Sequence, residues 1–202
     1  MSPRTNKQLD EIREQRRNDI LEAALELFAS QGYHNTSIEA IRKKAGVSKG
    51  LIYNYFDKKE DLVTGIMMAE VNQGDHFFEQ IVNASNSHER IHMLIEFSFQ
   101  SMRQNRDHHK LMIGLSLQLD LPEFSHLTDL IKGRYANLQP YAESLMKDMG
   151  YENAWGEAME LMATLDGIAF QYLILGEAVD LQRFKTFLIN KYCKPPQNVS
   201  HE

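Results

Sequence analysis

The chain has 202 residues, of which 43% are hydrophobic and 25% are charged, and it contains only 5 prolines. This composition excludes an intrinsically disordered chain and is typical of a globular protein with a sizeable core. The net charge of −6 is uneven, since residues 1–63 hold 11 basic against 10 acidic side chains and residues 64–202 hold 11 against 18. Such a distribution is compatible with a protein that binds nucleic acid through its N-terminal part alone.

Three further features bear on the compartment of the protein. The single cysteine, Cys193, cannot form an internal disulfide, which is typical of a reducing environment. The first twenty residues are polar and charged, so we expect no signal peptide. The longest apolar stretches, such as residues 173–175, are too short to span a bilayer. The sequence therefore predicts a cytoplasmic protein.

A first helix is predicted over residues 10–31. Its apolar side chains repeat with the i, i+4, i+7, i+8 spacing of one helix face, and Gly32 is a natural C-terminal stop. The residues with this spacing are Ile20, Ala24, Leu27 and Phe28.

A short second helix, a tight turn and a third helix follow. The second helix presents Ile38, Ile41 and Ala45 on its inward face. Gly46 supplies the left-handed or otherwise tight backbone that a turn between two short helices requires, and Ser48 stands at the N-cap of the next helix. This order of elements is the one that a helix-turn-helix DNA reader needs.

The outward face of the third helix carries the candidates for reading DNA. A glycine inside a helix costs about 1 kcal/mol relative to alanine, but a bare backbone allows the helix to approach a groove closely. The alternative is that Gly50 merely belongs to a frayed first turn. The outward residues are Ser48, Lys49, Gly50, Tyr53 and Asn54.

A long fourth helix is predicted to open at Asp57 and to run to about Asn83, with Glu60 completing a capping-box-like pair. Lys58 and Lys59 fall in its first turn, where the helix dipole disfavours lysine. A bound anion would remove this conflict, and a DNA phosphate is the natural candidate. The alternative is that both are solvated surface lysines.

Five more helices are predicted after a polar break at residues 83–87. Pro140 is expected to kink or split the third of these helices, and Gly150 and Gly176 are expected to end two of them. Residues 195–202 are predicted to form a flexible tail. The ranges of the five helices are 88–105, 108–119, 122–149, 152–177 and 180–192. The fold class is therefore all-α with about nine helices.

Residues 20–62 resemble the DNA-binding domain of the TetR family of bacterial transcriptional regulators. The matching stretches are Ala24-Leu25-Glu26-Leu27-Phe28, Gly32-Tyr33, Thr36-Ser37-Ile38, Ile41, Ala45-Gly46-Val47-Ser48-Lys49-Gly50, Ile52-Tyr53, Tyr55-Phe56 and Lys59-Glu60-Asp61-Leu62. The resemblance implies an N-terminal three-helix helix-turn-helix domain over residues 10–63, followed by a helical ligand-sensing and dimerisation domain over residues 64–194. It also implies a sequence-specific transcriptional regulator, most readily a ligand-responsive repressor that binds a palindromic operator as a homodimer, rather than an enzyme, and it implies no cofactor or metal.

The resemblance also assigns roles to single residues. The residues that resemble the family's phosphate-binding positions are Thr36, Ser37, Tyr55 and Lys59, with Lys58 as a weaker candidate. The residues that resemble its base-contacting positions are Lys49 and Gly50. Tyr53 resembles a residue that contacts either phosphate or base.

Basic residues ahead of the matched segment leave two readings open. Arg13 and Arg17 share a helix face, and with Arg16 they are either additional phosphate contacts or ordinary solvated charges. Arg4 and Lys7 are either an arm that reaches a minor groove or, as we favour, surface charges.

The C-terminal helices are predicted to form a four-helix interface with a second copy of the chain. The helix over residues 152–176 is apolar nearly all round, so it must be buried on more than one side. The alternative is a central core helix in a monomer. The predicted interface residues are Leu165, Ala169, Tyr172, Phe184 and Leu188.

The middle of the chain is rich in methionine and phenylalanine. Such residues at helical spacing usually form a core, but some of them could line a pocket for a small, apolar ligand. No charged group marks the polar end of such a ligand. The candidate pocket residues are Phe77, Phe97, Met102, Met112, Leu115 and Phe124.

One motif indicates a different class of protein. His88, Glu89 and His92 fit the H-E-x-x-H pattern of zinc peptidases. The third ligand is missing, because positions 95 and 98 are isoleucine and serine and no glutamate occurs between Glu96 and Glu123. We therefore predict two solvated histidines at an exposed helix start. A helical adaptor without affinity for DNA is the third class that the sequence leaves open.

Overall fold

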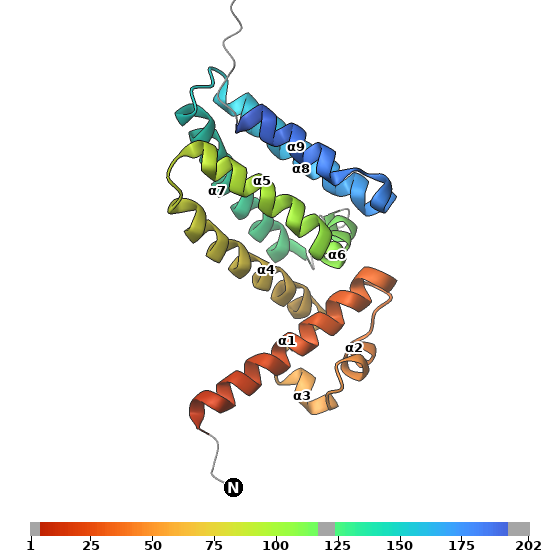
Figure 1. The fold of residues 1–202 in the computed structure, drawn as a ribbon. Coiled ribbons are helices and arrows are strands. Elements are labelled where there is room, and N and C mark those ends of the chain that lie inside the picture. The colour runs from red at the N-terminus through yellow and green to blue at the C-terminus, as the bar shows by residue number, and fades with distance from the viewer. Residues whose placement is uncertain (1–4, 117–123, 194–202) are drawn as a thin grey trace, which may run out of the picture. The chain divides into compact units, whose positions relative to one another are not determined.

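The computed structural model describes residues 5–116 and 124–193, apart from the side chains of residues 70–76, 126 and 134 (Figure 1). Throughout these ranges the regular structure is helical, which confirms the predicted all-α fold class. The chain divides into two compact units. Unit 1 comprises Met1–Gly74 with Lys110–Thr128, and unit 2 comprises Asp75–His109 with Asp129–Glu202. The predicted boundary near residue 63 stays a prediction, as does the tail, which lies outside the described residues.

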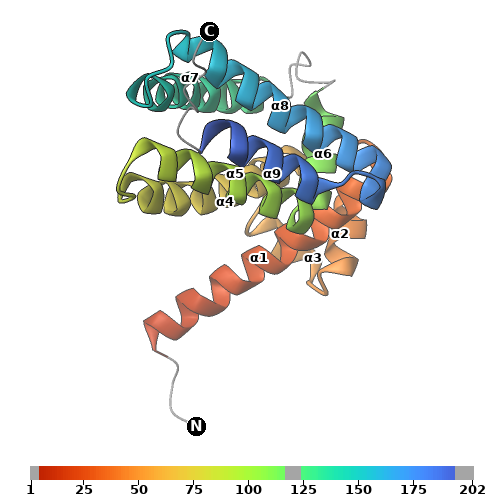
Figure 2. The same ribbon diagram turned by 45° about the horizontal axis from the view of Figure 1, so that its top comes forward.

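Unit 1 begins with three helices that match the predicted helix-turn-helix order. They are α1 (Asn6–Gln31), α2 (Ile38–Lys44) and α3 (Lys49–Tyr53), and Figure 2 shows the N-terminal half of α1 extending well beyond the other two. The first helix starts four residues earlier than predicted, because Thr5 and Gln8 form a capping box ahead of the apolar stripe. The fully buried side chains in the core of this part of unit 1 include Ile20, Ala24, Ile41, Ile52 and Leu62.

The helix α4 (Lys59–Val82) begins differently from the prediction. The predicted capping pair of Asp57 and Glu60 is wrong. It is the carboxylate of Asp61 that accepts hydrogen bonds from the backbone N–H groups of Asp57 at 3.1 Å and Lys58 at 3.0 Å. Glu60 instead accepts a hydrogen bond from the hydroxyl of Tyr33 at 2.9 Å. The N–H groups that we expected to attract an anion are therefore partly satisfied by the chain itself.

The remaining helices are α5 (Ser87–Gln104), α6 (Arg106–Ser116), α7 (Ser125–Asp148), α8 (Ala154–Leu175) and α9 (Leu181–Tyr192), with a short 3₁₀ turn at Gly176–Ala178. Pro140 lies inside α7, which continues past it as one helix. The core of unit 2 gathers side chains of α5, α7, α8 and α9, and α5 and α8 both pack against α9 (Figure 1).

One helix corrects the expectation that no stretch is long enough to span a bilayer. The segment Ala154–Ala178 is long and apolar enough by length and composition alone. This observation identifies no membrane span, because the core helix of a soluble protein passes the same test, and one face of α8 does belong to the core of unit 2.

Candidate nucleic-acid interface

The turn between α2 and α3 is built by local contacts. Ser37 and Ser48 cap the two helices, and their hydroxyls accept hydrogen bonds from the backbone N–H groups of Ala40 at 3.1 Å and Leu51 at 3.2 Å. Gly46 adopts a φ of 65°, the left-handed conformation that favours glycine. Val47 is buried beside it. These contacts hold α3 in a fixed orientation with respect to α2.

The outward face of α3 is free of packing. Lys49, Gly50, Tyr53 and Asn54 are all exposed, and Tyr53 keeps 44% of its surface accessible. A Cβ atom placed on Gly50 would meet nothing within 4 Å inside the described structure. The residues predicted to read DNA therefore share one accessible surface. Packing against the described residues therefore does not require a glycine at this position.

Two of the predicted phosphate contacts are engaged inside unit 1. Thr36 is only 2% exposed, and its hydroxyl donates to the backbone carbonyls of Gly32 at 2.9 Å and Leu27 at 3.2 Å. Its side chain is thus engaged at the end of α1, and the phosphate role predicted for it stays a prediction. Ser37 is exposed but serves as the N-cap of α2.

The ammonium group of Lys59 is also directed inward. Its Nζ donates to the carbonyls of Tyr33 at 2.9 Å and Thr36 at 3.2 Å, and it lies 4.1 Å from the centre of the Tyr33 ring. These contacts give Lys59 a second candidate role, in holding the turn between α1 and α2 against the start of α4, and its phosphate role stays a prediction. Lys58 is exposed and Tyr55 is half-buried, so both remain candidates for phosphate contact.

Tyr33 connects several elements of unit 1. Besides its contacts with Lys59, its ring meets that of Phe124 edge-on at 5.0 Å, and its hydroxyl donates to Glu60. Burial alone would raise the pKa of Glu60, but a backbone amide, this hydroxyl and nearby lysines outweigh it and lower the pKa. The carboxylate therefore stays ionised where the hydroxyl needs an acceptor.

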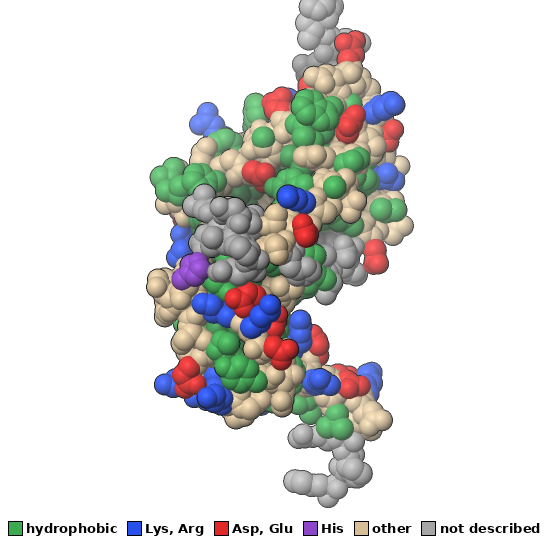
Figure 3. Space-filling view, turned by 180° about the vertical axis from the view of Figure 1, so that it is seen from behind, with side chains coloured by type: hydrophobic (Ala, Val, Ile, Leu, Met, Phe, Trp, Pro, Cys, Tyr) green, Lys and Arg blue, Asp and Glu red, His purple; other side chains and the backbone are tan. Residues whose placement is uncertain are grey.

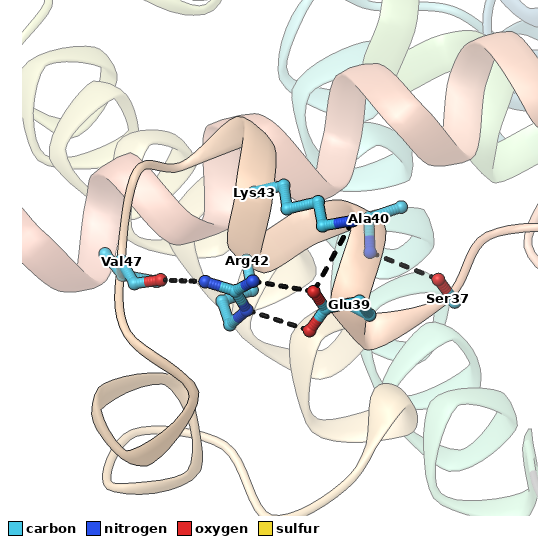
Figure 4. A network of polar contacts seen from close by, with 6 residues as sticks. All are labelled: Ser37, Glu39, Ala40, Arg42, Lys43 and Val47. Carbon is cyan, nitrogen blue, oxygen red and sulfur yellow. Dashed lines mark hydrogen bonds and ion pairs between the residues drawn. The ribbon is translucent and has the colours of Figure 1, made fainter.

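Arg42 makes contacts at the turn between α2 and α3 that the sequence reasoning missed (Figure 4). Its Nη1 donates to the carbonyl of Val47 at 2.9 Å, while Nε and Nη2 donate to the two carboxylate oxygens of Glu39 at 2.8 and 2.6 Å. The hydrogen bond from Arg42 lowers the pKa of Glu39 to about 2, and the same bond raises the pKa of Arg42. The i, i+3 spacing of the two residues signals the pair, but no sequence pattern signals the contact with Val47.

The exposed surface of unit 1 carries charges of both signs. Arg17 lies 3.9 Å from Glu14 and Arg16 lies 3.5 Å from Asp19. In the lower part of Figure 3, basic side chains alternate with acidic ones rather than forming a continuous basic patch. A shallow hollow of about 300 Å³ lies between α1 and the end of α3. It is lined by Asp10, Arg13, Glu14, Arg17, Asn54 and Tyr55. Arg4 lies outside the described residues.

Two residues of the H-E-x-x-H motif, His88 and Glu89, make contacts within their own chain. The Nδ1 atom of His88 lies 3.3 Å from the carbonyl oxygen of Tyr192, and the carboxylate of Glu89 accepts a hydrogen bond from the backbone N–H of Ser85 at 2.8 Å. Within the described ranges, no three His, Cys, Asp or Glu side chains are placed to hold a metal ion together.

The predicted dimer residues are largely covered by their own chain. Tyr172 and Leu188 are 9% and 2% exposed, and Leu165, Ala169 and Phe184 pack against the same core. Their role in an interface stays a prediction, and Leu165, Ala169 and Phe184 are only partly buried. The large apolar side chains that α8 and α9 leave exposed are Trp155, Phe170, Ile174, Leu175 and Phe187.

The predicted pocket residues do not form one cluster within one unit. Phe77, Phe97 and Met102 lie in unit 2, where the two phenylalanine rings are stacked at 4.0 Å and Met102 is buried in the core. The other three lie in unit 1, where Leu115 and Phe124 are buried and Met112 is half-buried. The candidate pocket residues therefore stay a prediction.

Comparison with known proteins identifies the N-terminal segment. A family model described as "Bacterial regulatory proteins, tetR family" matches residues 20–66. The uncharacterized HTH-type transcriptional regulator YuxN of Bacillus subtilis is 29% identical over 178 residues, which cover 85% of this chain and 60% of YuxN. The fatty acid metabolism regulator protein of the same organism is 30% identical over 123 residues, which cover 59% of this chain and 61% of that protein. The matched segments thus span about 60% of the length of both relatives.

Known structures share the fold over most of the chain. A transcriptional regulator from Saccharomonospora viridis in complex with choline aligns with a TM-score of 0.72 and 22% identity, over 88% of this chain and 95% of that one. FadR from Bacillus subtilis in complex with stearoyl-CoA aligns with a TM-score of 0.66 and 21% identity, over 89% of this chain and 98% of that one. At these identities the likeness shows the fold alone.

Proposed function

We propose that this chain, which belongs to the TetR family of bacterial regulatory proteins, is a sequence-specific DNA-binding transcriptional regulator of the cytoplasm. The observation that carries the proposal is the accessible face of α3, where Lys49, Gly50, Tyr53 and Asn54 stand on a turn held rigid from both sides. A short helix with a bare backbone position can enter the major groove, and lysine and asparagine side chains can hydrogen-bond base edges there.

A homodimer is the second element of the proposal. Trp155, Phe170, Ile174 and Phe187 keep between 49% and 62% of their surfaces accessible on α8 and α9. Phe170 and Ile174 are one helical turn apart on α8, and neighbouring exposed apolar side chains are typical of an interaction surface. A second copy covers them, and its own α3 binds a matching half-site, so the operator is a palindrome with half-sites about 34–36 Å apart.

Response to a small molecule is the third element. One relative is a fatty acid metabolism regulator, and two structures with the same fold contain choline and stearoyl-CoA. We propose that a ligand bound in unit 2 lowers the affinity for the operator, so that the protein acts as a ligand-responsive repressor. The ligand can do so only through its different affinity for the two forms of the protein, and operator DNA must weaken ligand binding by the same factor.

Selection of DNA sequences with the purified full chain tests the first element. We expect a palindromic site to be enriched. The substitution Lys49→Ala should change the preferred bases, because a base-edge contact is worth roughly 1–3 kcal/mol. Lys147→Ala is the matched control, since Lys147 is an exposed lysine at the far end of α7. Failure to enrich any sequence would contradict the proposal.

Sedimentation at micromolar concentration tests the dimer. The substitution Ile174→Glu introduces a charge into the exposed apolar face at a position that is 62% accessible in the single chain. It should therefore leave the fold intact and shift the protein towards monomer. A wild-type protein that sediments as a monomer would remove the homodimer from the proposal without touching the DNA-binding element.

A further inference from the structure

Three side-chain atoms within the described residues are buried without a hydrogen-bond partner: Nε of Arg90, the hydroxyl of Tyr141 and Oε2 of Glu157. A buried donor or acceptor that has lost water and gained no partner is destabilising, so each such atom requires an explanation. Glu157 has one, because its Oε2 lies 3.6 Å from the ammonium of Lys191 and forms an ion pair with it. The two donors on Arg90 and Tyr141 remain without a partner.

Both groups adjoin the C-terminal end of α4, where Arg90 contacts Val82 and Tyr141 contacts Phe78, about one helical turn earlier. Arg90 lies in the first turns of α5, and its Nη2 donates to the carbonyls of Val82 at 3.1 Å and Ala84 at 3.3 Å at the end of α4. The guanidinium is thereby fixed while its Nε–H is directed elsewhere. Tyr141 follows Pro140 in α7. Burial raises the pKa of the Tyr141 phenol, and the positive charge of Arg90 acts in the opposite direction.

Aromatic rings flank the two donors. The ring of Phe78 meets that of Tyr141 edge-on at 5.6 Å, and Phe77 and Phe97 are stacked at 4.0 Å between α4 and α5. Aromatic rings of α4 and α5 therefore lie next to the ring that carries the Tyr141 hydroxyl, near the end of α4 that Arg90 contacts. This is the combination that ligand sites use: apolar contacts supply affinity, and a few polar groups fix the orientation.

We propose that Arg90 and Tyr141 form the polar end of a ligand site in unit 2, which takes an acyl compound with its carboxylate or thioester carbonyl oxygen between the two donors. An N–H of a guanidinium and a phenolic O–H together suit an oxygen acceptor, and a charged or strongly polar one above all. A ligand with a cationic head is excluded by the charge of Arg90. The inference rests on the ligand-responsive element of the proposed function and names the class of ligand and the residues that recognise it.

Calorimetric titration of the full chain with dodecanoate, dodecanoyl-CoA, dodecan-1-ol and choline tests the ligand class. We expect binding of the acid or the thioester, weaker binding of the alcohol and none of choline. Comparison of the acid with the thioester shows whether the acceptor is a free carboxylate or an acyl carbonyl. Binding of choline in preference to both acyl compounds would overturn the assignment.

The substitution Tyr141→Phe tests the residues, because it removes only the hydroxyl. Acyl binding should weaken about tenfold or more, as expected for the loss of a hydrogen bond to a charged or polar head. Without ligand, the variant should melt at the same temperature as the wild type or higher, because an unsatisfied buried hydroxyl has gone. If the Tyr141 hydroxyl served only to stabilise the fold, its removal would lower the melting temperature. Arg90→Lys should also weaken binding while keeping a positive charge near the two carbonyls.

Tyr151→Phe is the matched control. The hydroxyl of Tyr151 is also part-buried in unit 2, but it donates to the carbonyl of Lys191 at 3.3 Å. Its removal should lower the melting temperature and leave acyl binding unchanged. If Tyr141→Phe and Arg90→Lys bind acyl ligands like the wild type, the site is wrong although the proposed function stands. If acyl binding depends on Tyr141 but leaves operator affinity unchanged, the site stands and the ligand-responsive element of the proposed function fails.

Discussion

Replacement of Lys59 by methionine separates two roles that a lysine at the start of α4 can have. The substitution keeps the length and apolar stem of the side chain and removes the ammonium. In the structure that ammonium donates to the carbonyls of Tyr33 and Thr36 and lies over the Tyr33 ring. The carbonyl of Tyr33 also accepts from the N–H of Thr36 at 3.2 Å, so it keeps a partner in the variant. The carbonyl of the buried Thr36 loses the ammonium.

The expected loss of stability follows from these contacts. A hydrogen bond to a charged group contributes roughly 1.5–3 kcal/mol, and a partly exposed cation–π contact adds about 0.5–1 kcal/mol. Because Lys59 is only half-buried and one carbonyl stays bonded, we expect a net loss of about 2 kcal/mol. In a chain of this size each kcal/mol lowers the melting temperature by roughly 2–4 °C. Thermal unfolding followed by circular dichroism should therefore show a decrease of about 4–8 °C.

The salt dependence of DNA binding provides the second measurement. A lysine that neutralises a phosphate contributes about 0.9 to the slope of log affinity against log salt concentration, once in each subunit. Lys59→Met should leave this slope unchanged at temperatures where the variant is folded. Lys58→Met is the control, since the neighbouring Lys58 is exposed; it should lower the slope and leave the melting temperature unchanged. An unchanged melting temperature together with a lower slope for Lys59→Met would refute the structural role of Lys59.

Three further outcomes follow from contacts in unit 1. Arg42→Gln removes the hydrogen bond to the Val47 carbonyl and should weaken specific DNA binding about tenfold, or about 1.4 kcal/mol, in an electrophoretic mobility shift assay. Lys43→Gln should bind like the wild type in the same assay, because Lys43 contacts Glu39 at 3.7 Å but not the turn. The pKa of Glu39 is lowered from 4.5 to about 2 in the folded chain, so its contribution to stability is present above pH 4.5 and is lost as the pH falls towards 2. Glu39→Gln should therefore flatten the dependence of the unfolding free energy on pH in that window. An unaltered profile would show that the Glu39–Arg42 pair does not contribute to stability. Gly50→Ala should stabilise the chain by up to about 1 kcal/mol, because the added Cβ meets only open space, and it should weaken DNA binding, because the bare backbone is lost. Gly65→Ala should instead destabilise the chain, because a Cβ there would lie 2.8 Å from Leu21. The reverse order of the two melting temperatures would contradict the packing described.

The features that could be predicted from the sequence are those set by neighbours along the chain. The i, i+4, i+7 spacing of Ile20, Ala24 and Leu27 predicts α1, and Ser37 and Ser48 cap the next two helices as their positions require. Gly46 has the positive φ that a turn between short helices favours. These signals act within one or two turns of helix, so they survive whatever the chain packs against later.

The features that could not be predicted depend on partners far away in the sequence. Lys59 stands where a phosphate-binding lysine is expected, but Tyr33 and Thr36 lie 26 and 23 residues before it and supply the carbonyls that it contacts. The same holds for Arg90, which the structure brings to the end of α4, near where α4 also meets Tyr141, 51 residues later in the chain.

This difference also separates the predicted reading surface from the predicted ligand site. Lys49, Gly50, Tyr53 and Asn54 belong to one short helix, so helical periodicity alone places them on one face. A ligand site within a helical bundle draws one or two residues from each of several helices, and the residues that matter are recognised by an unsatisfied hydrogen-bonding atom rather than by their type. The apolar residues chosen from the sequence turned out to be split between two cores, whereas Nε of Arg90 and the hydroxyl of Tyr141 are identified only once burial and partners are known.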